Sequence, residues 1–394
     1  MTAGYPISVG SRRRRTTAFI HGRDSWLRRV DWVLLAATAA LIVLGTLLVY
    51  SATRQKMIDA GVDPQSYLKK HLLNIGIGLA LGVMTSLFDY RALRAYAPIV
   101  YLGSLVGLVL VLSPLGSNVN GAQAWIQLPA GFSIQPSELA KVALVVSLAM
   151  LLAERKDAER EPGNVDIVLA LVVAAVPMAL IMLQPDLGTT AVMAAIVLGV
   201  LAVAGVSTRW MVGLVAAGAL AATVAVLSGF LSTYQVDRLA AFANPQLDPQ
   251  GFGYNVNQSL ITVGSGGLTG QGLFHGTQTN GLFVPEQQTD FVFTVAGEEL
   301  GFVGSALIVV LVGLVLWRGL RIAARADDMF GRLVAVGIVC WFTFQAFENI
   351  GMTLGIMPVT GVPLPLISYG GSSMFANLMA IGLLENVHLR RSLN

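Results

Sequence analysis

Charged residues are scarce in this chain. Asp, Glu, Lys and Arg make up 12% of its 394 residues, whereas hydrophobic residues make up 55%. A soluble domain carries about 25% charged residues, so the composition excludes an ordinary water-soluble protein. A transmembrane helix needs roughly 20 mostly apolar residues, and about ten apolar runs approach that length. The expected fold is therefore an all-α polytopic membrane protein with about ten transmembrane helices.

Cysteine and histidine are also rare. Cys340 is the only cysteine and lies in an apolar run, which excludes a disulfide framework and a cysteine-based metal site. The four histidines, His21, His71, His275 and His388, are scattered without the paired spacing of a zinc site. No Ser-His-Asp nucleophile motif is present either, so the carboxylates are the chemical candidates.

The apolar runs predict the order of the membrane spans. They lie near 32–50, 72–88, 93–113, 138–153, 166–183, 187–205, 210–230, 300–317, 331–356 and 365–387. Basic residues gather in the connections on one side, including the arginines at 12–15, which no small-residue cleavage site follows. By the positive-inside rule that side is cytoplasm.

This topology predicts a domain organisation. We expect a cytoplasmic basic arm at 1–30, a single transmembrane domain at 31–394, and both termini in the cytoplasm. The net charge of +3 fits basic flanks of membrane spans rather than nucleic-acid binding.

Two long connections fall on the opposite, extracytoplasmic side. Residues 114–136 mix Gly, Pro and Trp with apolar residues, and residues 231–298, between the seventh and eighth spans, far exceed the usual connection length. Long structured loops commonly carry function, so we expect the active site on this side.

Asp290 is placed between a polar run and an apolar one in segment 284–293. A carboxylate at the boundary between water and membrane is partly desolvated, which raises its pKa towards the range of a general base. The alternative is a helix N-cap, which an Asp before an apolar run also resembles. Asp186, between Pro185 and Leu187, fits an N-cap in the same way.

Other ionisable residues gather near the same side. Glu138 and Lys141 are three apart and can form an ion pair, which either fixes helix packing or faces a substrate. Glu298 and Glu299 are adjacent, and at least one is expected to face a wet cavity or a cationic partner.

Two glycine-rich segments call for unusual backbone. Residues 264–272 fail the dinucleotide-binding spacing and predict a tight loop that approaches other backbone closely. Residues 369–373 fit small-residue helix packing or a broken helix that lines a cavity.

Six motifs in order resemble the SEDS family (shape, elongation, division and sporulation). They are GAQAWI at 121–126, QPSELAK at 135–141, QPDLGT at 184–189, PEQ and TDF within 285–291, GEELGF at 297–302, and residues 358–373. A match in this order along nearly the whole chain is far more specific than any single motif. Residues 276–278 before 283–287 are closer to the RodA-type branch than to the FtsW-type branch.

The resemblance implies a peptidoglycan glycosyltransferase of the bacterial cytoplasmic membrane that polymerises lipid II into β-1,4-linked glycan during cell elongation and rod-shape maintenance. It also implies a lipid-linked glycan as second substrate, a class B penicillin-binding protein as transpeptidase partner, and other elongation-complex proteins.

The family's functional residues fall on specific positions of this sequence. Its essential aspartate falls on Asp290, its loop tryptophan on Trp125, and a cavity-lining pair on Glu138 and Lys141. Ala124 stands where many members carry an arginine, so the family's phosphate-binding role is not assigned to that position. Gln288 replaces a frequent histidine, which puts a proton relay through that position in doubt.

The expected mechanism has Asp290 deprotonate the acceptor 4-hydroxyl, which attacks the donor's anomeric carbon and expels undecaprenyl pyrophosphate. Lys141 and Arg238 are candidates to stabilise the pyrophosphate, and Glu298 is a further candidate substrate ligand. A divalent cation, Mg or Mn, held by Asp290 is the alternative to a general base. A lipid II flippase and a scaffold that recruits a partner are the rival functions, but carboxylates concentrated on one side favour an enzyme.

Overall fold

The computed structural model describes residues 29–119, 122–128, 132–157, 162–229, 233–244 and 251–391. The expected basic arm lies outside the described residues except for Arg29 and Val30, and so does Gly121 of the first family motif.

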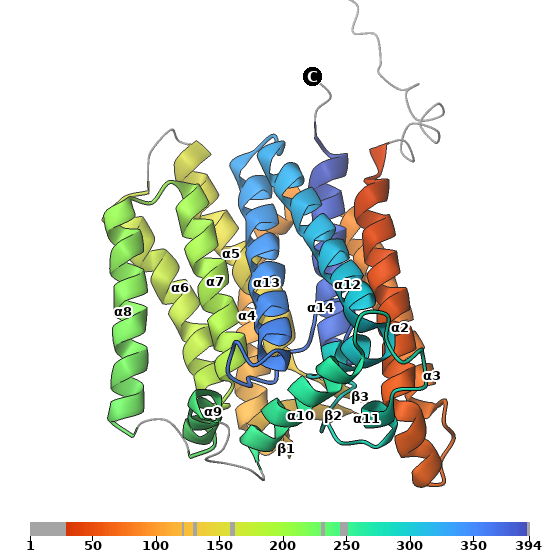
Figure 1. Cartoon of the computed structure of the whole chain (residues 1–394). Helices are drawn as coiled ribbons and strands as arrows, with labels where there is room; N and C mark the ends of the chain where they lie inside the picture. The colour runs from red at the N-terminus through yellow and green to blue at the C-terminus, as the bar shows by residue number, and fades with distance from the viewer. Residues whose placement is uncertain are drawn as a thin grey trace, which may run out of the picture.

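The described part of the chain is mainly helical (Figure 1). Its helices are α2 (Trp32–Asp59), α3 (Ser66–Leu87), α4 (Tyr90–Leu112), α5 (Pro136–Asp157), α6 (Asn164–Met182), α7 (Leu187–Ala204), α8 (Thr208–Leu227), α9 (Thr233–Ala243), α10 (Phe252–Ser265), α11 (Thr277–Asn280), α12 (Val292–Ala324), α13 (Met329–Thr353) and α14 (Gly371–Leu389). Among the described residues, nine helices are long and apolar enough to cross a membrane: α2 to α8, α12 and α13. The expected polytopic membrane fold is confirmed.

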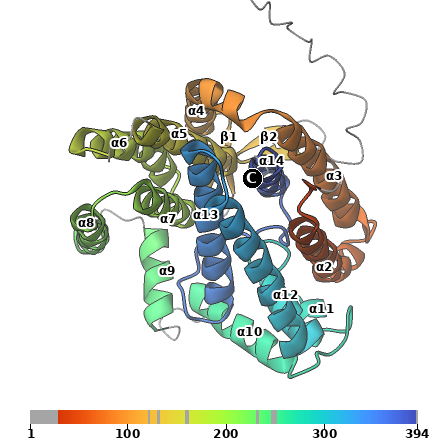
Figure 2. The ribbon, with the colours of Figure 1, turned by 90° about the horizontal axis from the view of Figure 1, so that it is seen from above.

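The tenth expected span corresponds to α14, which is less apolar than the other nine because it includes Asn377, Glu385 and Asn386. These three side chains are buried. Viewed along the bundle, α14 lies inside it, between α3, α5 and α13 (Figure 2). Protein rather than lipid therefore surrounds its polar residues, which makes such a helix tolerable at membrane depth.

The two ends of the bundle differ in character. The described chain ends lie at one end, together with the arginines at the ends of α12 and α14 (Figure 1). The opposite end carries α9, α10, α11 and a small sheet (Figure 1). The long connections at 114–136 and 231–298 thus gather at one end, away from the described termini.

A three-stranded sheet occupies the connection between α4 and α5, where no strand was expected. Strands β1 (Gly116–Val119), β2 (Ala122–Leu128) and β3 (Phe132–Ile134) pair antiparallel in the order β1-β2-β3. Ser117 pairs with Trp125, and Gln127 pairs with Ser133. Strand pairing satisfies backbone groups that an irregular segment would leave without partners near the bilayer.

Helix α12 begins eight residues before the expected span and is broken at Gly301, where φ is +66°. The glycine-rich loop supplies hydrogen bonds at the break: the Gln271 amide donates to the Glu298 carbonyl (2.9 Å), and the Phe302 amide donates to the Gly267 carbonyl (2.9 Å). A Cβ at Gly270 would lie 2.1 Å from the Glu299 carbonyl oxygen. The loop approaches other backbone as closely as its glycines predicted.

The segment between α13 and α14 is irregular, so the tenth span starts six residues later than expected. This irregular segment reaches the middle of α2, where a Cβ at Gly45 would lie 2.5 Å from the Ile367 carbonyl oxygen. Ile367 is buried. Irregular backbone is tolerated at this depth because protein encloses it or because it lines a cavity.

Candidate active site

A cavity of about 350 Å³ lies at the end of the bundle that carries the sheet. Five separate parts of the chain build its wall: the sheet, the turn before α7, helix α9, the segment before α12, and the segment that leads into α14. The lining residues are Ala122, Ala124, Trp125, Gln127, Ser133, Gln135, Pro185, Asp186, Arg238, Glu286, Thr289, Asp290, Thr360, Gly361, Pro363, Tyr369, Gly370 and Ser373.

Asp290 lines this cavity and does not cap α12. The N-cap of α12 is Phe291, and no side chain caps that helix. The structure therefore rules out the N-cap interpretation of Asp290. Its half-buried carboxylate faces the cavity.

Desolvation and the nearby Glu286 carboxylate raise the pKa of Asp290 to about 7, against the lowering effect of the Arg238 guanidinium. Glu286 lines the same wall and has a φ of +48°, a conformation uncommon for a residue with a side chain. An aspartate with a pKa near neutrality is suited to take and release a proton at physiological pH.

Arg238 of α9 lies on the same side of the cavity as Asp290. A Cβ at Gly361 would be 3.2 Å from Asp290 Oδ2 and 3.7 Å from Arg238 Nη2. Arg238 Nη1 donates to the Thr360 carbonyl (2.9 Å), and its guanidinium lies over the Phe252 ring. The cavity thus pairs a carboxylate of raised pKa with an oriented guanidinium, a donor suited to phosphate oxygens.

The backbone of Asp290 is held from α13. Asn349 Nδ2 donates to the Asp290 carbonyl (2.8 Å) and to the Val362 carbonyl (2.8 Å). Asn349 is itself buried. One amide therefore joins the segment that carries Asp290 to the segment that carries Gly361.

Trp125 stands between this cavity and a more apolar one. It lines both, together with Ser133, Thr289, Tyr369 and Gly370. The second cavity, of about 340 Å³, extends towards α3, where Lys70 lines it. Trp125 and Asp290 line the same cavity, and a substrate role for Trp125 stays a prediction.

Asp186 has two functions in the structure. It caps α7 as expected, accepting from the Thr189 amide (2.9 Å) and the Thr189 hydroxyl (2.8 Å). It also lines the cavity, and its charge contributes to the raised pKa of Asp290.

Lys141 and Glu138 do not line the cavity. Lys141 is fully buried, donates to Glu138 (2.8 Å) and to Gln345 (2.9 Å), and lies over the Trp341 ring. This arrangement fits the packing interpretation; a substrate role for these two residues stays a prediction, and no cavity contact supports it. Gln345 in turn donates to the Pro363 carbonyl in the cavity wall (2.7 Å).

Glu298 and Glu299 also depart from expectation. The Glu298 carboxylate is buried and accepts from the Gln278 amide (2.7 Å) and the Thr279 amide (2.8 Å) at α11. Glu299 accepts from the Ser51 hydroxyl (2.5 Å). Backbone and hydroxyl donors replace the expected wet cavity or cation, so the expected substrate contact of Glu298 has no support in this placement.

Several cavity residues were not singled out from the sequence: Glu286, Thr289, Thr360, Gly361 and Tyr369. All five lie in or beside segments that match family motifs. The sequence does not show that segment 357–370 folds against the residues before α12, so their shared cavity could not be predicted. Among residues 29–391 apart from the undescribed gaps, no group of three or more His, Cys, Asp or Glu is arranged to hold a metal ion.

Comparisons with known proteins agree with this architecture. A family model for FtsW, RodA and SpoVE, described as a cell cycle protein, matches residues 31–393. The chain is 40% identical to stage V sporulation protein E of Bacillus subtilis over 91% of its length and 96% of that protein. It is 38% identical to peptidoglycan glycosyltransferase MrdB of Escherichia coli over 92% of its length and 95% of that protein.

A solved structure shares the fold. It comes from work on the structural coordination of polymerization and crosslinking by a peptidoglycan synthase complex, and superposes with a TM-score of 0.73 at 32% identity, covering 91% of this chain and 97% of that one.

Proposed function

The chain belongs to the FtsW/RodA/SpoVE family and, like its relative MrdB, is a peptidoglycan glycosyltransferase. We propose that it polymerises lipid II with Asp290 as the general base. The observation that carries this assignment is the placement of Asp290. Its carboxylate has a raised pKa, caps no helix, and faces a cavity beside an arginine.

In the proposed reaction, Asp290 takes the proton from the 4-hydroxyl of the acceptor N-acetylglucosamine. The oxygen attacks the anomeric carbon of the lipid-linked donor, a β-1,4 bond forms, and undecaprenyl pyrophosphate leaves with inversion. General-base catalysis of this kind contributes about 10²–10⁴-fold to the rate.

Arg238 stabilises the leaving pyrophosphate in this proposal. Its guanidinium is held by the Thr360 carbonyl and lies close to Asp290, so base and cation face the same reacting group. Such preorganised charge is among the largest contributions to enzyme catalysis.

A divalent cation is the alternative source of positive charge. Mg²⁺ is commonly bound by one or two carboxylates together with substrate phosphates. Asp290 and Glu286, which line one wall, would supply the carboxylates. When bound, the cation would offset the charge on the pyrophosphate.

We place the cavity on the extracytoplasmic side of the membrane. The support is the distribution of arginines, which gather at the opposite end of the bundle, as the positive-inside rule requires of the cytoplasmic side. They are Arg91 and Arg94 at the start of α4 and Arg318, Arg321 and Arg325 at the end of α12.

We assign the chain to the RodA-type branch on residues 276–278, with an FtsW-type division role as the alternative. Its partner would be a class B penicillin-binding protein, a proposal supported by the synthase complex to which the fold is similar. Replacement of a host's RodA or FtsW by this chain separates the two branches: rescue of rod shape supports the first, and rescue of septation alone contradicts it.

The test of the activity uses the protein reconstituted with its crosslinking partner and lipid II. Wild type should make glycan polymer, and Asp290→Asn should lose activity by about 100-fold or more. Asp237→Asn, an exposed aspartate on α9, is the matched control. Polymer from the Asp290 variant at the wild-type rate would refute the assignment, and translocation of fluorescent lipid II without polymer would favour the flippase.

A further inference from the structure

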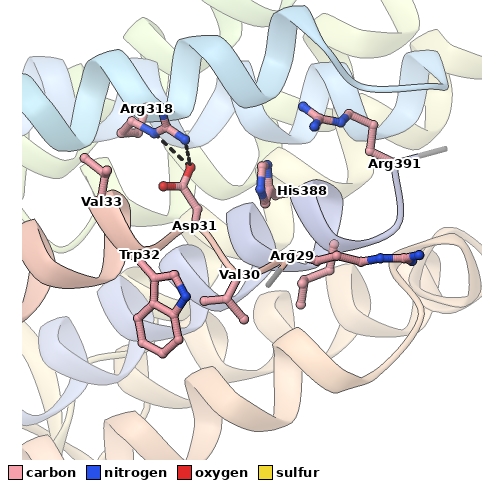
Figure 3. A pocket seen from close by; sticks show the side chains of 9 residues that line it. Arg29, Val30, Asp31, Trp32, Val33, Arg318, His388 and Arg391 are labelled. Carbon is pink, nitrogen blue, oxygen red and sulfur yellow. Dashed lines mark hydrogen bonds and ion pairs between the residues drawn. The ribbon is translucent and has the colours of Figure 1, made fainter. Parts of the chain in front are cut away.

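A basic cavity lies at the other end of the bundle, remote from Asp290. It has a volume of about 360 Å³ and is lined by Arg29, Val30, Asp31, Trp32, Val33, Arg318, His388, Leu389 and Arg391. Figure 3 shows these residues gathered around the start of α2 and the ends of α12 and α14. The polymerisation mechanism uses none of them.

The charge of this cavity is positive. Arg318 Nη2 contacts Asp31 Oδ2 at 2.5 Å, so the single aspartate in the lining is neutralised (Figure 3). Asp31 Oδ1 also caps α2 through the Leu34 amide (3.0 Å). Within the described part of the chain, neither Arg29 nor Arg391 has a carboxylate partner. Three arginines against one aspartate leave two positive charges in the lining of this cavity.

An apolar cavity of about 430 Å³ continues from the basic one. The two share Val30 and Leu389, and the apolar cavity runs along α2, α3 and α14. Three of its lining residues, Val43, Leu79 and Val83, are 58%, 48% and 56% exposed. No described part of the chain covers this groove, which opens towards the lipid side of α2 and α3.

Glycines explain why the groove exists. A Cβ at Gly82 of α3 would lie 2.8 Å from the Leu378 carbonyl oxygen, and a Cβ at Gly382 of α14 would lie 2.2 Å from the Gly82 carbonyl oxygen. Gly78 and Gly82 have the spacing that lets membrane helices approach closely. Helix α3 is thereby drawn onto α14, whereas α2 packs mainly on α12, which leaves a gap between α2 and α3.

We propose that these two cavities bind one anionic phospholipid, with its phosphate beside Arg29 and Arg391 and an acyl chain in the groove between α2 and α3. A polar, negatively charged group covalently joined to a hydrocarbon chain matches the continuous basic and apolar surfaces. Basic pockets between membrane helices on the cytoplasmic side recognise such headgroups.

Trp32 supports a placement of the basic cavity at the level of the lipid headgroups. Trp32 is 59% exposed and lines the basic cavity, where an indole is favoured at the level of lipid headgroups. The one carboxylate in the groove, Glu385, is buried and accepts from the Asp31 amide (2.9 Å). It therefore belongs to the helix contacts beneath the lipid.

The site selects an anionic lipid over a zwitterionic one. Phosphatidylcholine would bring a quaternary ammonium next to the guanidiniums of Arg29 and Arg391, whereas phosphatidylglycerol brings only negative charge. Each arginine near an anionic headgroup strengthens binding by about fivefold, so the pair together gives roughly 25-fold.

The experiment measures lipid retention by native mass spectrometry of the purified full-length protein. Phosphatidylglycerol should bind at least about tenfold more tightly than phosphatidylcholine of the same chains, and Arg29→Gln with Arg391→Gln should remove that preference. Arg209→Gln, an exposed arginine at the start of α8 on the far side of the bundle, is the matched control and should keep it (Figure 2).

A second variant tests the groove separately. Ala39→Phe places a ring on an exposed position of the groove without changing the charge, and should weaken the binding of both lipids. A thermal melt of each variant in detergent verifies its folding. Equal retention of the two lipids by the wild-type protein would overturn the proposal. Binding of glycerol 3-phosphate at the same concentration as phosphatidylglycerol would also overturn it, because it would indicate a site for free phosphate. Neither outcome depends on glycan synthesis.

Discussion

Asn349 donates one amide hydrogen bond to the carbonyl of Asp290 and a second to that of Val362. The segment that carries Asp290 is therefore fixed to α13 through its backbone, and the Asp290 carboxylate lines the cavity. The rigidity of this link sets how precisely Asp290 meets a substrate hydroxyl.

Asn349→Leu keeps the size of the side chain but removes both hydrogen bonds. Two buried carbonyls would lose a donor, each at a cost of about 1–3 kcal/mol. We expect polymerisation to fall by about 10- to 100-fold because a small misplacement of a catalytic group is costly. Initial polymerisation rates with lipid II measure this loss. Asn349→Asp should be as inactive as the Leu variant, since a carboxylate cannot donate the two hydrogen bonds.

Glu286→Gln should shift the pH dependence of activity. The Glu286 charge helps raise the pKa of Asp290 to about 7, so removing that charge lowers the pKa. The active base is the ionised form, and activity is lost as pH falls through its pKa. The acidic limb of the rate profile should therefore move to lower pH, and an unchanged limb would argue against Asp290 as the titrating base.

Arg238→Gln should shift the same limb in the opposite direction. The guanidinium lowers the pKa of Asp290, so its loss moves the acidic limb to higher pH. The plateau rate should also drop by about 100-fold or more, since the leaving pyrophosphate loses its cation. Arg238→Lys should recover part of the plateau, and full activity of the Gln variant would remove Arg238 from the mechanism.

Gly361→Ala probes the contact between Asp290 and Arg238. Gly361 has a φ of +76°, and the new methyl would lie 3.2 Å from Asp290 Oδ2. The backbone conformation costs about 1–2 kcal/mol for an alanine, and the carboxylate must move. We expect a melting temperature a few degrees lower and a rate reduced by about tenfold. Gly313→Ala, in open space on α12, is the control and should change neither.

Lys141→Met tests whether the buried ion pair is structural. Removing one partner leaves the Glu138 carboxylate buried and unpaired, which costs about 3–5 kcal/mol. The double variant with Glu138→Gln should recover much of that stability in a thermal melt. If instead Lys141→Met melts like wild type but cannot bind lipid II, the pair has a substrate role after all.

The membrane fold was predictable because hydropathy is a local property. Nine of the ten expected apolar runs coincide with helices that can span a bilayer. α14 was located by its apolar residues, but its polar side chains are tolerated only through neighbours that sequence does not show. The break at Gly301 and the earlier start of α12 depend on hydrogen bonds from the loop at 264–272, which is distant from that helix end in sequence.

The candidate site was predictable in part. Asp290 could be singled out from its place between polar and apolar runs and from the family motif, but its alternative as an N-cap could be rejected only from geometry. Glu298 was expected to face a wet cavity or a cation because buried charge is costly, and Lys141 was expected to bind substrate because of the family resemblance. The structure satisfies both charges from within the protein, through donors of α11 and through Glu138 and Gln345.

The polarity of α14 bears on how the protein is made. A helix that carries Asn377, Glu385 and Asn386 partitions poorly into lipid alone, so it must enter the membrane against helices already in place, with the glycines of α3 offering a ready surface. The residues just before and within its first turn, Tyr369, Gly370 and Ser373, close the wall around Asp290. A chain inserted only as far as α13 would therefore lack part of the wall around Asp290, so the last helix completes the cavity.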